Sequence, residues 1–136
     1  MDDCIFCKII SGELPCNKIY EDEEILAFLD INPIAKGHTL VIPKKHCLDI
    51  FDIDDDSVEK VARVCKNISV AMQKGIGAEG INILHASKKV AQQTVFHFHM
   101  HVVPRFSDDS IKAFPKPAYS YDDASKIAEM ISQVLI

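Results

Sequence analysis

The stretch Thr94-Val95-Phe96-His97-Phe98-His99-Met100-His101-Val102-Val103 decides both the fold class and the chemistry expected of this chain. From Phe96 to Val103 histidine and apolar residues alternate, which is the pattern of a half-buried β-strand, and Pro104 closes it. Successive side chains of a strand point to opposite faces, so the three histidines share one face. The apolar side chains between them share the other face, and we expect them to pack under a long helix.

The three imidazole side chains would lie in a row on one face of the strand. Neighbouring rings would lie roughly 6.5–7 Å apart along the strand, so repulsion disfavours protonation of all three, and at least one is expected to be neutral at pH 7. A neutral imidazole can attack phosphorus, bind a metal ion or move a proton. The alternative is an exposed polar face that carries histidine by chance. Because three of the chain's six histidines stand at strict alternation, we favour a functional site.

The remaining sequence predicts an α+β domain, with an antiparallel sheet of about five strands backed by one long helix. The first two strands form a hairpin that turns near Asp22-Glu23. Loop residues separate the second strand from the third over 32–37. The strands are expected at 18–21, 25–30, 38–42, 81–85 and 96–103.

The long helix is predicted from about Ser57 to Lys74, where one stripe is apolar at helical spacing. We expect the helix to begin at a capping box formed by Asp56 and Glu59 and to end at Gly75 and Gly77. A short helix is expected between Cys4 and Gly12. A last helix opens at Asp122 or Asp123, with an apolar side expected to face inward and formed by Ile127, Ala128, Ile131 and Leu135.

Composition restricts the classes of protein to which this chain can belong. Its 136 residues suit a single domain, 1–136, and its net charge of −5, from 15 basic and 20 acidic residues, argues against a general nucleic-acid or anionic-membrane partner. The acidic N-terminus has no apolar signal region, and no apolar stretch approaches the roughly 20 residues of a membrane span. Five cysteines are an odd number, so we expect no disulfide framework and a reducing, cytoplasmic location.

The alternation from His97 to Val103 resembles the signature of the histidine triad (HIT) superfamily. Three further stretches resemble its Hint branch, in the same order and at the same spacing: Cys4–Ile10 with Glu13-Leu14-Pro15, Leu26–Ile31 and Gly37–His46. The resemblance covers the chain from Cys4 to about Arg105, and the C-terminal thirty residues match less distinctly. It implies a HIT-like fold, and a homodimer formed by the long helix and a sheet edge. An apolar helix stripe alone would suit a monomer core equally.

The resemblance also implies a two-step displacement on the α-phosphate of a nucleotide. His99 would attack phosphorus and form a nucleotidyl-histidine intermediate that water then hydrolyses. His101 would hydrogen-bond the phosphate and assist the leaving group, and His38 on the neighbouring strand would complete the polar groups. Thr94 stands where the family usually has serine, and its hydroxyl can still donate a hydrogen bond.

For the nucleoside, the resemblance places Asp30 on the ribose hydroxyls, a task that suits a carboxylate with two acceptor oxygens. Gln93 joins the nucleotide-binding set. The purine would lie in an apolar pocket of Ile5, Phe6, Ile9, Leu14, Phe28 and Ile31. Without the resemblance, those six residues would be predicted as plain core.

Two positions depart from the Hint pattern and bear on substrate and rate. Ala86 stands where an asparagine commonly helps to bind phosphate. Gln92 replaces a glycine whose backbone N–H approaches the phosphate, so a side chain narrows that approach. Nearby His85 and Ser87 are candidates to compensate.

The spacing Cys4-x-x-Cys7 suits two thiolates on one tetrahedral zinc ion, which needs two further ligands. Two buried thiols or a redox pair fit the same spacing. The resemblance to zinc-bearing bacterial members supplies His46 and His97 as partners. A Cys2His2 set leaves no open position, so such a zinc ion would be structural. The other cysteines are expected to be packing residues, and no organic cofactor is expected.

Together these features predict a hydrolase of purine nucleoside 5′-phosphoramidates, that is, AMP or GMP conjugates. The nearest rival is a diadenosine polyphosphate hydrolase. A nucleotide-binding or scaffolding protein with a weakened site is the alternative that Ala86 and Gln92 permit. A metal-dependent hydrolase with three catalytic histidine ligands is a further alternative, but three alternating histidines on one strand form a poor tripod for one zinc ion.

Overall fold

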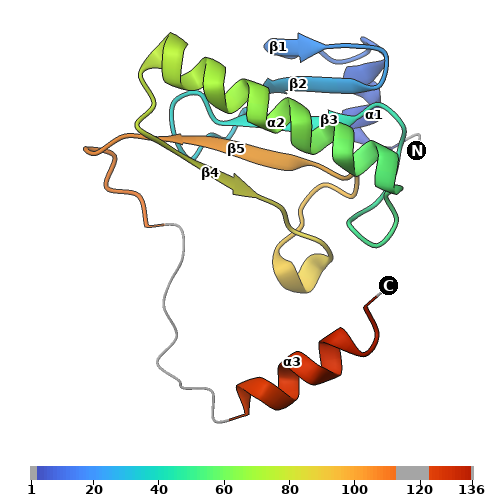
Figure 1. Ribbon diagram of the computed structural model, residues 1–136. Helices are drawn as coiled ribbons and strands as arrows, with labels where there is room; N and C mark the ends of the chain where they lie inside the picture. Colours follow the sequence, from blue (N-terminus) through green and yellow to red (C-terminus); the bar gives the residue numbers. More distant parts are fainter. Residues whose placement is uncertain (1–2, 113–122, 136) are drawn as a thin grey trace.

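The computed structural model describes residues 3–112 and 123–135, and its centre is one antiparallel sheet (Figure 1). The strands lie in the order β1-β2-β3-β5-β4, so the histidine-bearing β5 runs between β3 and β4. Their bounds are β1 Lys18–Glu21, β2 Ile25–Leu29, β3 Thr39–Pro43, β4 Gly80–Leu84 and β5 Met100–Arg105. This arrangement confirms the predicted α+β class with its five-stranded antiparallel sheet.

The two faces of the sheet carry two different apolar clusters, because side chains alternate along each strand. On one face the long helix α2, Asp55–Ile76, covers the sheet (Figure 1), and Cys65 and Ile68 of the helix join a cluster with Phe98 and Val102. On the other face the short helix α1, Ile5–Ile10, contributes its buried Phe6 to a cluster with Leu26, Phe28, Leu40 and Ile42. The histidines that alternate with the α2-facing residues therefore lie on the α1 face.

The prediction for the histidine-bearing strand was wrong at both ends. The strand begins at Met100 rather than Phe96, because the N–H of Phe98 donates to the Cys47 carbonyl, 2.7 Å away, instead of joining a strand ladder. At the other end Pro104 lies inside the strand, which continues to Arg105. Pairing with β3 covers only Met100 to Val102, so the ladder on that side has ended before the proline that lacks an N–H.

The long helix is confirmed, with a different cap. Asp54 is the N-cap and its side chain accepts a hydrogen bond from the Ser57 N–H, 2.9 Å away, so the predicted box of Asp56 and Glu59 was wrong. At the C-terminal end Gly77 adopts a φ of 71°, the left-handed conformation that glycine reaches without steric cost.

The C-terminal helix α3, Ala124–Ser132, is preceded by Asp123 as N-cap, while Asp122 lies outside the described residues. The prediction that its apolar side faces inward was wrong, because Ile127, Ala128, Ile131 and Leu135 are all exposed. Figure 1 shows α3 standing apart from the sheet. Across the described ranges, no helix combines the length and apolar character needed to cross a membrane.

Candidate functional site

A cavity of about 760 Å³ opens on the α1 face of the sheet and gathers most of the predicted site residues. It lies between α1, the loop after β2 and the segment that leads into β5. The predicted residues that line it are Ile5, Phe6, Ile9, Phe28, Asp30, Ile31, His38, Gln93, Thr94, His99 and His101. Leu14 is half-buried and is not among the lining residues.

Several lining residues were not predicted from the sequence. They flank predicted ones along the chain: Pro15, Cys16, Asn17, Leu29, Asn32, Ile34, Leu40 and Val95. Asn32 and Ile34 lie in the predicted Pro-Gly loop, and Pro15, Leu29 and Leu40 lie in stretches that resemble the Hint branch, but none of these signals indicated a site residue. Ala86 and Gln92, the two departures from the Hint pattern, also line the cavity.

His99 presents an unprotonated nitrogen to this cavity. Its Nδ1 lies 2.7 Å from the backbone carbonyl of His97, and a carbonyl oxygen can only accept, so Nδ1 carries the proton. In the neutral ring the lone pair is then on Nε2. Burial is the main cause that lowers the pKa of His99, which favours this neutral form.

His101 presents an N–H to the cavity instead, because of a chain of two hydrogen bonds that begins at the backbone of Ile34 and passes through His38. The backbone N–H of Ile34 donates to His38 Nδ1 at 3.0 Å, so neutral His38 carries its proton on Nε2. That Nε2 lies 2.9 Å from His101 Nδ1 and donates to it, which leaves the His101 proton on Nε2. Burial, followed by the neighbouring His99 and His38, lowers the pKa of His101 to about 4.

The cavity therefore contains an unprotonated ring nitrogen and an N–H donor side by side, with the rings of His99 and His101 5.0 Å apart. Asp30 Oδ2 lies 3.6 Å from His38 Nε2 and adds negative charge at the same end. Asp30, His38 and His101 also lie close enough together to suggest a metal site. The tautomers argue against it, because His38 Nε2 is protonated and directed at His101.

Gln93 has a structural role that its sequence position did not indicate. Its buried side-chain amide accepts from the Lys88 N–H at 2.8 Å and donates to the carbonyls of Leu48, at 2.7 Å, and Val95, at 3.0 Å. All these partners are backbone groups, so Gln93 holds the 88–93 loop against the rest of the site. Its neighbour Gln92 adopts a φ of 71°, a conformation that favours glycine.

The four predicted metal ligands converge in a second cluster behind the cavity. Cys4 Sγ lies 3.4 Å and Cys7 Sγ 3.6 Å from His97 Nδ1, while His46 Nδ1 lies 3.3 Å from Cys7 Sγ and 3.2 Å from His97 Nδ1. Nitrogen and sulfur ligands on one tetrahedral zinc ion are about 3.3–3.6 Å from one another. The cluster can therefore hold a metal ion.

The protonation states of this cluster also suit a cation. His97 Nε2 donates to the Pro43 carbonyl at 2.8 Å, so the nitrogen that faces the thiols, Nδ1, is unprotonated. Burial and the adjacent Cys4 raise the pKa of Cys7 to about 11, and a positive ion between the two sulfurs would reverse that effect.

The three alternating histidines are thus divided between two sites. His97 belongs to the Cys/His cluster, whereas His99 and His101 line the cavity. The ring of Phe6 joins the two sites, with centroids 5.8 Å from the His97 ring and 5.2 Å from the His99 ring. The prediction that the three histidines share one face agrees with the contacts of the His97 and His99 rings with Phe6 of α1, although the strand itself begins only at Met100.

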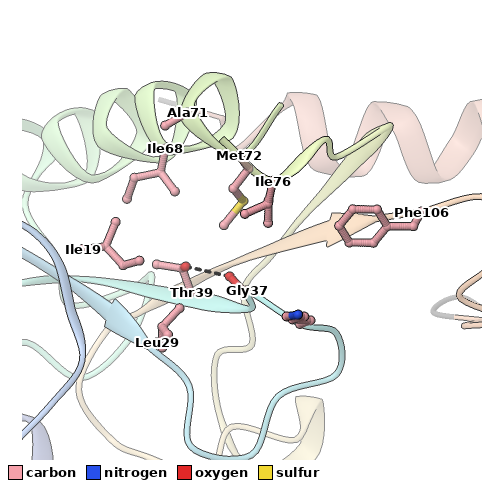
Figure 2. A pocket seen from close by; sticks show the side chains of 10 residues that line it. Ile19, Leu29, Gly37, Thr39, Ile68, Ala71, Met72, Ile76 and Phe106 are labelled. Carbon is pink, nitrogen blue, oxygen red and sulfur yellow. Dashed lines mark hydrogen bonds between the residues drawn. The ribbon is translucent and has the colours of Figure 1, made fainter. Parts of the chain in front are cut away.

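A second cavity, of about 670 Å³, lies on the α2 face near the C-terminal half of α2 (Figure 2). Its described lining contains no histidine or cysteine, and the close-up shows Met72, Ile76 and Phe106 around it. Thr39 points its hydroxyl to the Gly37 carbonyl, 2.8 Å away, so that polar group is already satisfied. This cavity is apolar and offers none of the chemistry of the first.

Comparison with known proteins identifies the class that this fold and site define. The HIT domain family matches residues 11–108. The chain belongs to the HIT family. It is 54% identical, over 80% of each chain, to an uncharacterised HIT-like protein of Borreliella burgdorferi. It is 37% identical, over 95% of this chain and 96% of the other, to adenosine 5′-monophosphoramidase hnt1 of Schizosaccharomyces pombe.

Solved structures agree with the fold, and one of them is described as zinc-bound. A HIT family protein from Bacillus anthracis matches with a TM-score of 0.90 and 41% identity over 99% of both chains. A zinc-bound histidine triad family protein from Mycobacterium smegmatis matches with a TM-score of 0.80 and 40% identity, over 97% of this chain and 98% of that one.

Proposed function

We propose that this protein hydrolyses purine nucleoside 5′-phosphoramidates through a nucleotidyl-histidine intermediate. The observation that carries the proposal is the pair of fixed tautomers, a lone pair on His99 Nε2 and an N–H on His101 Nε2 in one cavity. A nucleophile needs the first and a phosphate oxygen needs the second. The Schizosaccharomyces pombe relative, which bears the name adenosine 5′-monophosphoramidase, supports this substrate class.

In the first step His99 Nε2 attacks the α-phosphorus, a P–N bond to the ring forms, and the bond to the leaving nitrogen breaks. The leaving nitrogen takes a proton from solvent water through the Thr94 hydroxyl, while His101 Nε2–H holds a phosphate oxygen. The ring becomes a cationic phosphoimidazole, and the His97 carbonyl that accepts its Nδ1–H stabilises that charge. In the second step water attacks phosphorus, the P–Nε2 bond breaks, and the water proton returns to solvent.

For the nucleoside, we propose that the base packs among the apolar side chains of Phe6, Ile9 and Phe28, which line the same cavity. Ile5 and Ile31 are more exposed, at 42% and 83%, and would cover the base from the rim. Asp30 lines the same cavity, 3.6 Å from His38 Nε2, and its carboxylate would accept hydrogen bonds from the ribose hydroxyls.

The test is turnover of a fluorogenic AMP phosphoramidate by the wild type and by His99→Ala. We expect turnover by the wild type and a loss of at least about a hundredfold in the variant. If both proteins are equally inactive while AMP still binds, the chain is a nucleotide-binding protein and the enzyme proposal fails. Faster cleavage of diadenosine polyphosphates than of phosphoramidates would favour the rival substrate class.

We further propose that the Cys/His cluster holds a structural zinc ion. The ligand spacing and the unprotonated Nδ1 of His97 support this, as does the zinc-bound Mycobacterium smegmatis relative. Four protein ligands leave no position for substrate or water, so the ion would fix α1 to the segment around His97.

A homodimer is our remaining proposal, and exposed apolar surface supports it. Met130, Ile131 and Val134 are 60% or more exposed on or next to α3, and the cavity in Figure 2 is apolar. Sedimentation equilibrium tests it: a mass of twice the chain mass of 15.2 kDa is expected, and a monomer at micromolar concentration would overturn it.

A further inference from the structure

His85 is the histidine that neither site uses. All six histidines lie in the described ranges, and the other five either line the first cavity or belong to the Cys/His cluster. His85 directly follows β4, is half-buried, and stacks on the Phe98 ring at 4.4 Å between centroids and 28° between planes. Phe98 is the residue next to His99, so His85 lies directly beside the candidate nucleophile.

The ring of His85 connects the backbone of His99 to a distant loop. His85 Nδ1 lies 2.8 Å from the His99 carbonyl, which can only accept, so Nδ1 carries the proton. Its Nε2 lies 2.5 Å from Ser87 Oγ, which itself accepts from the Ile50 N–H at 2.9 Å. The Ser87 proton is then free to donate to His85 Nε2. Ile50 thus donates to Ser87, Ser87 to His85, and His85 to the carbonyl of His99, which accepts the last hydrogen bond.

The hydrogen bond from His85 to the His99 carbonyl lies just beyond the end of the β4–β5 hydrogen-bond ladder. The last residue of β4, Leu84, has His101 as its Cα partner, and β5 begins only at Met100. The carbonyl of His99 therefore lies beyond the paired residues of β4 and β5, and the side chain of His85 supplies its donor. His99 is held at two points, its ring by the His97 carbonyl and its own carbonyl by His85.

We propose that His85 is a positioning residue for the nucleophile His99. It does not line the cavity, so it acts through the backbone of His99 rather than on substrate. The hydrogen bond fixes the peptide that follows His99 and with it the direction of the Cα–Cβ bond, so that Nε2 is aimed at the phosphate before substrate binds. This inference rests on the proposed function, because it assigns His85 a role in that reaction.

The experiment compares His85→Ala with His85→Asn on the AMP phosphoramidate. In asparagine the amide nitrogen occupies the place of Nδ1 on Cγ, so this variant can still donate to the His99 carbonyl, although it loses the contact with Ser87. We expect kcat to fall about tenfold in His85→Ala with KM within about twofold of wild type, and to recover to within about threefold in His85→Asn. Ser87→Ala is the matched control, with a loss of no more than about threefold.

A second readout separates this proposal from the proposed function. In ¹⁵N-labelled protein the His99 Nδ1–H proton should be protected from exchange in wild type and His85→Asn, and exposed to it in His85→Ala. If wild type turns over no phosphoramidate, the proposed function fails and this NMR signal alone decides the role of His85. Unchanged kcat in His85→Ala overturns the proposal. Equal losses in the two variants, or unchanged protection of the His99 proton, overturn it as well.

Discussion

The Nε2 atom of His38 lies 2.9 Å from the Nδ1 atom of His101, and this contact sets the proton that His101 offers to the cavity. His38 cannot reverse the hydrogen bond, because its own Nδ1 already accepts from the Ile34 backbone N–H at 3.0 Å. A backbone group on the loop before β3 thus determines, through two rings, which nitrogen of His101 carries hydrogen.

Removal of His38 should therefore cost activity through His101. In His38→Ala the ring of His101 loses the partner that selects its tautomer, and we expect kcat on the AMP phosphoramidate to fall about tenfold or more. His38→Gln keeps a donor near the position of Nε2 and should recover most of that loss. Steady-state kinetics of both variants checks this; equal losses would show that His38 does not act through its donated hydrogen bond.

The buried histidines predict a stability that falls in mild acid. Folding lowers the pKa of His101 from its ordinary value of 6.5 to about 4, mainly by burial. The unfolded chain therefore binds the proton more readily, so this contribution is fully present above pH 6.5 and is lost as the pH falls from there through about 4. Urea unfolding at pH 7, 5.5 and 4.5 measures it, and His101→Asn should lose less stability across that range than wild type.

Much of this site was predictable because its chemistry follows local sequence patterns. The alternation around His99 and the spacing of Cys4 and Cys7 survive in the structure as one cavity and one cluster. The limits of the histidine strand were not predictable, because they depend on a hydrogen bond from Phe98 to Cys47, 51 positions earlier in the chain. A periodic pattern records which side of a segment is buried and does not record where its ladder of hydrogen bonds begins.

The hydrogen-bonding roles of Gln93 and His85 escaped prediction for the same reason. Gln93 binds the Leu48 carbonyl and His85 the His99 carbonyl, and neither partner is marked by residue type, since every residue has a carbonyl. The exposed side of α3 is a different case. Its helical periodicity was predicted, but periodicity alone does not say what covers the apolar side.

The Cys/His cluster predicts one zinc ion per chain and a large loss of stability when it is removed. Stripping the metal with a chelator should lower Tm by about 10 °C or more, because the proposed ion would join α1 to the segment around His97. Cys7→Ser should bind less zinc and show the same lowered Tm. Cys16→Ser is the matched control, since Cys16 is also half-buried but lies outside the cluster. Elemental analysis and thermal unfolding measure both quantities; a Tm unaffected by metal removal would contradict a structural role.

Substitutions of the two adjacent glutamines should have unequal effects on stability. Gln92 adopts a φ of 71°, and this strain costs the folded state about 1 kcal/mol for a residue with a Cβ. Glycine relieves the strain, but its greater freedom in the unfolded chain costs roughly 0.5–1 kcal/mol on folding. The two effects nearly cancel, so Gln92→Gly should change the free energy of unfolding by less than about 1 kcal/mol. Gln93→Ala leaves the Lys88 N–H and two carbonyls without their partner and should cost about 2 kcal/mol or more.

The kinetics of the Gln92 and Gln93 variants should also differ, because the Gln92 side chain would restrict access to the phosphate whereas the Gln93 side chain supports the loop. Gln92 is exposed at the cavity, so its removal should preserve kcat and lower KM for substrates with bulky leaving groups. Gln93 is 3% exposed, and its loss should lower kcat for every substrate, because the loop that carries Gln92 and leads to Thr94 shifts. Urea unfolding together with kinetics on small and large leaving groups distinguishes these effects. A destabilised Gln92→Gly with unchanged KM would show that the Gln92 side chain supports the loop and does not restrict the cavity.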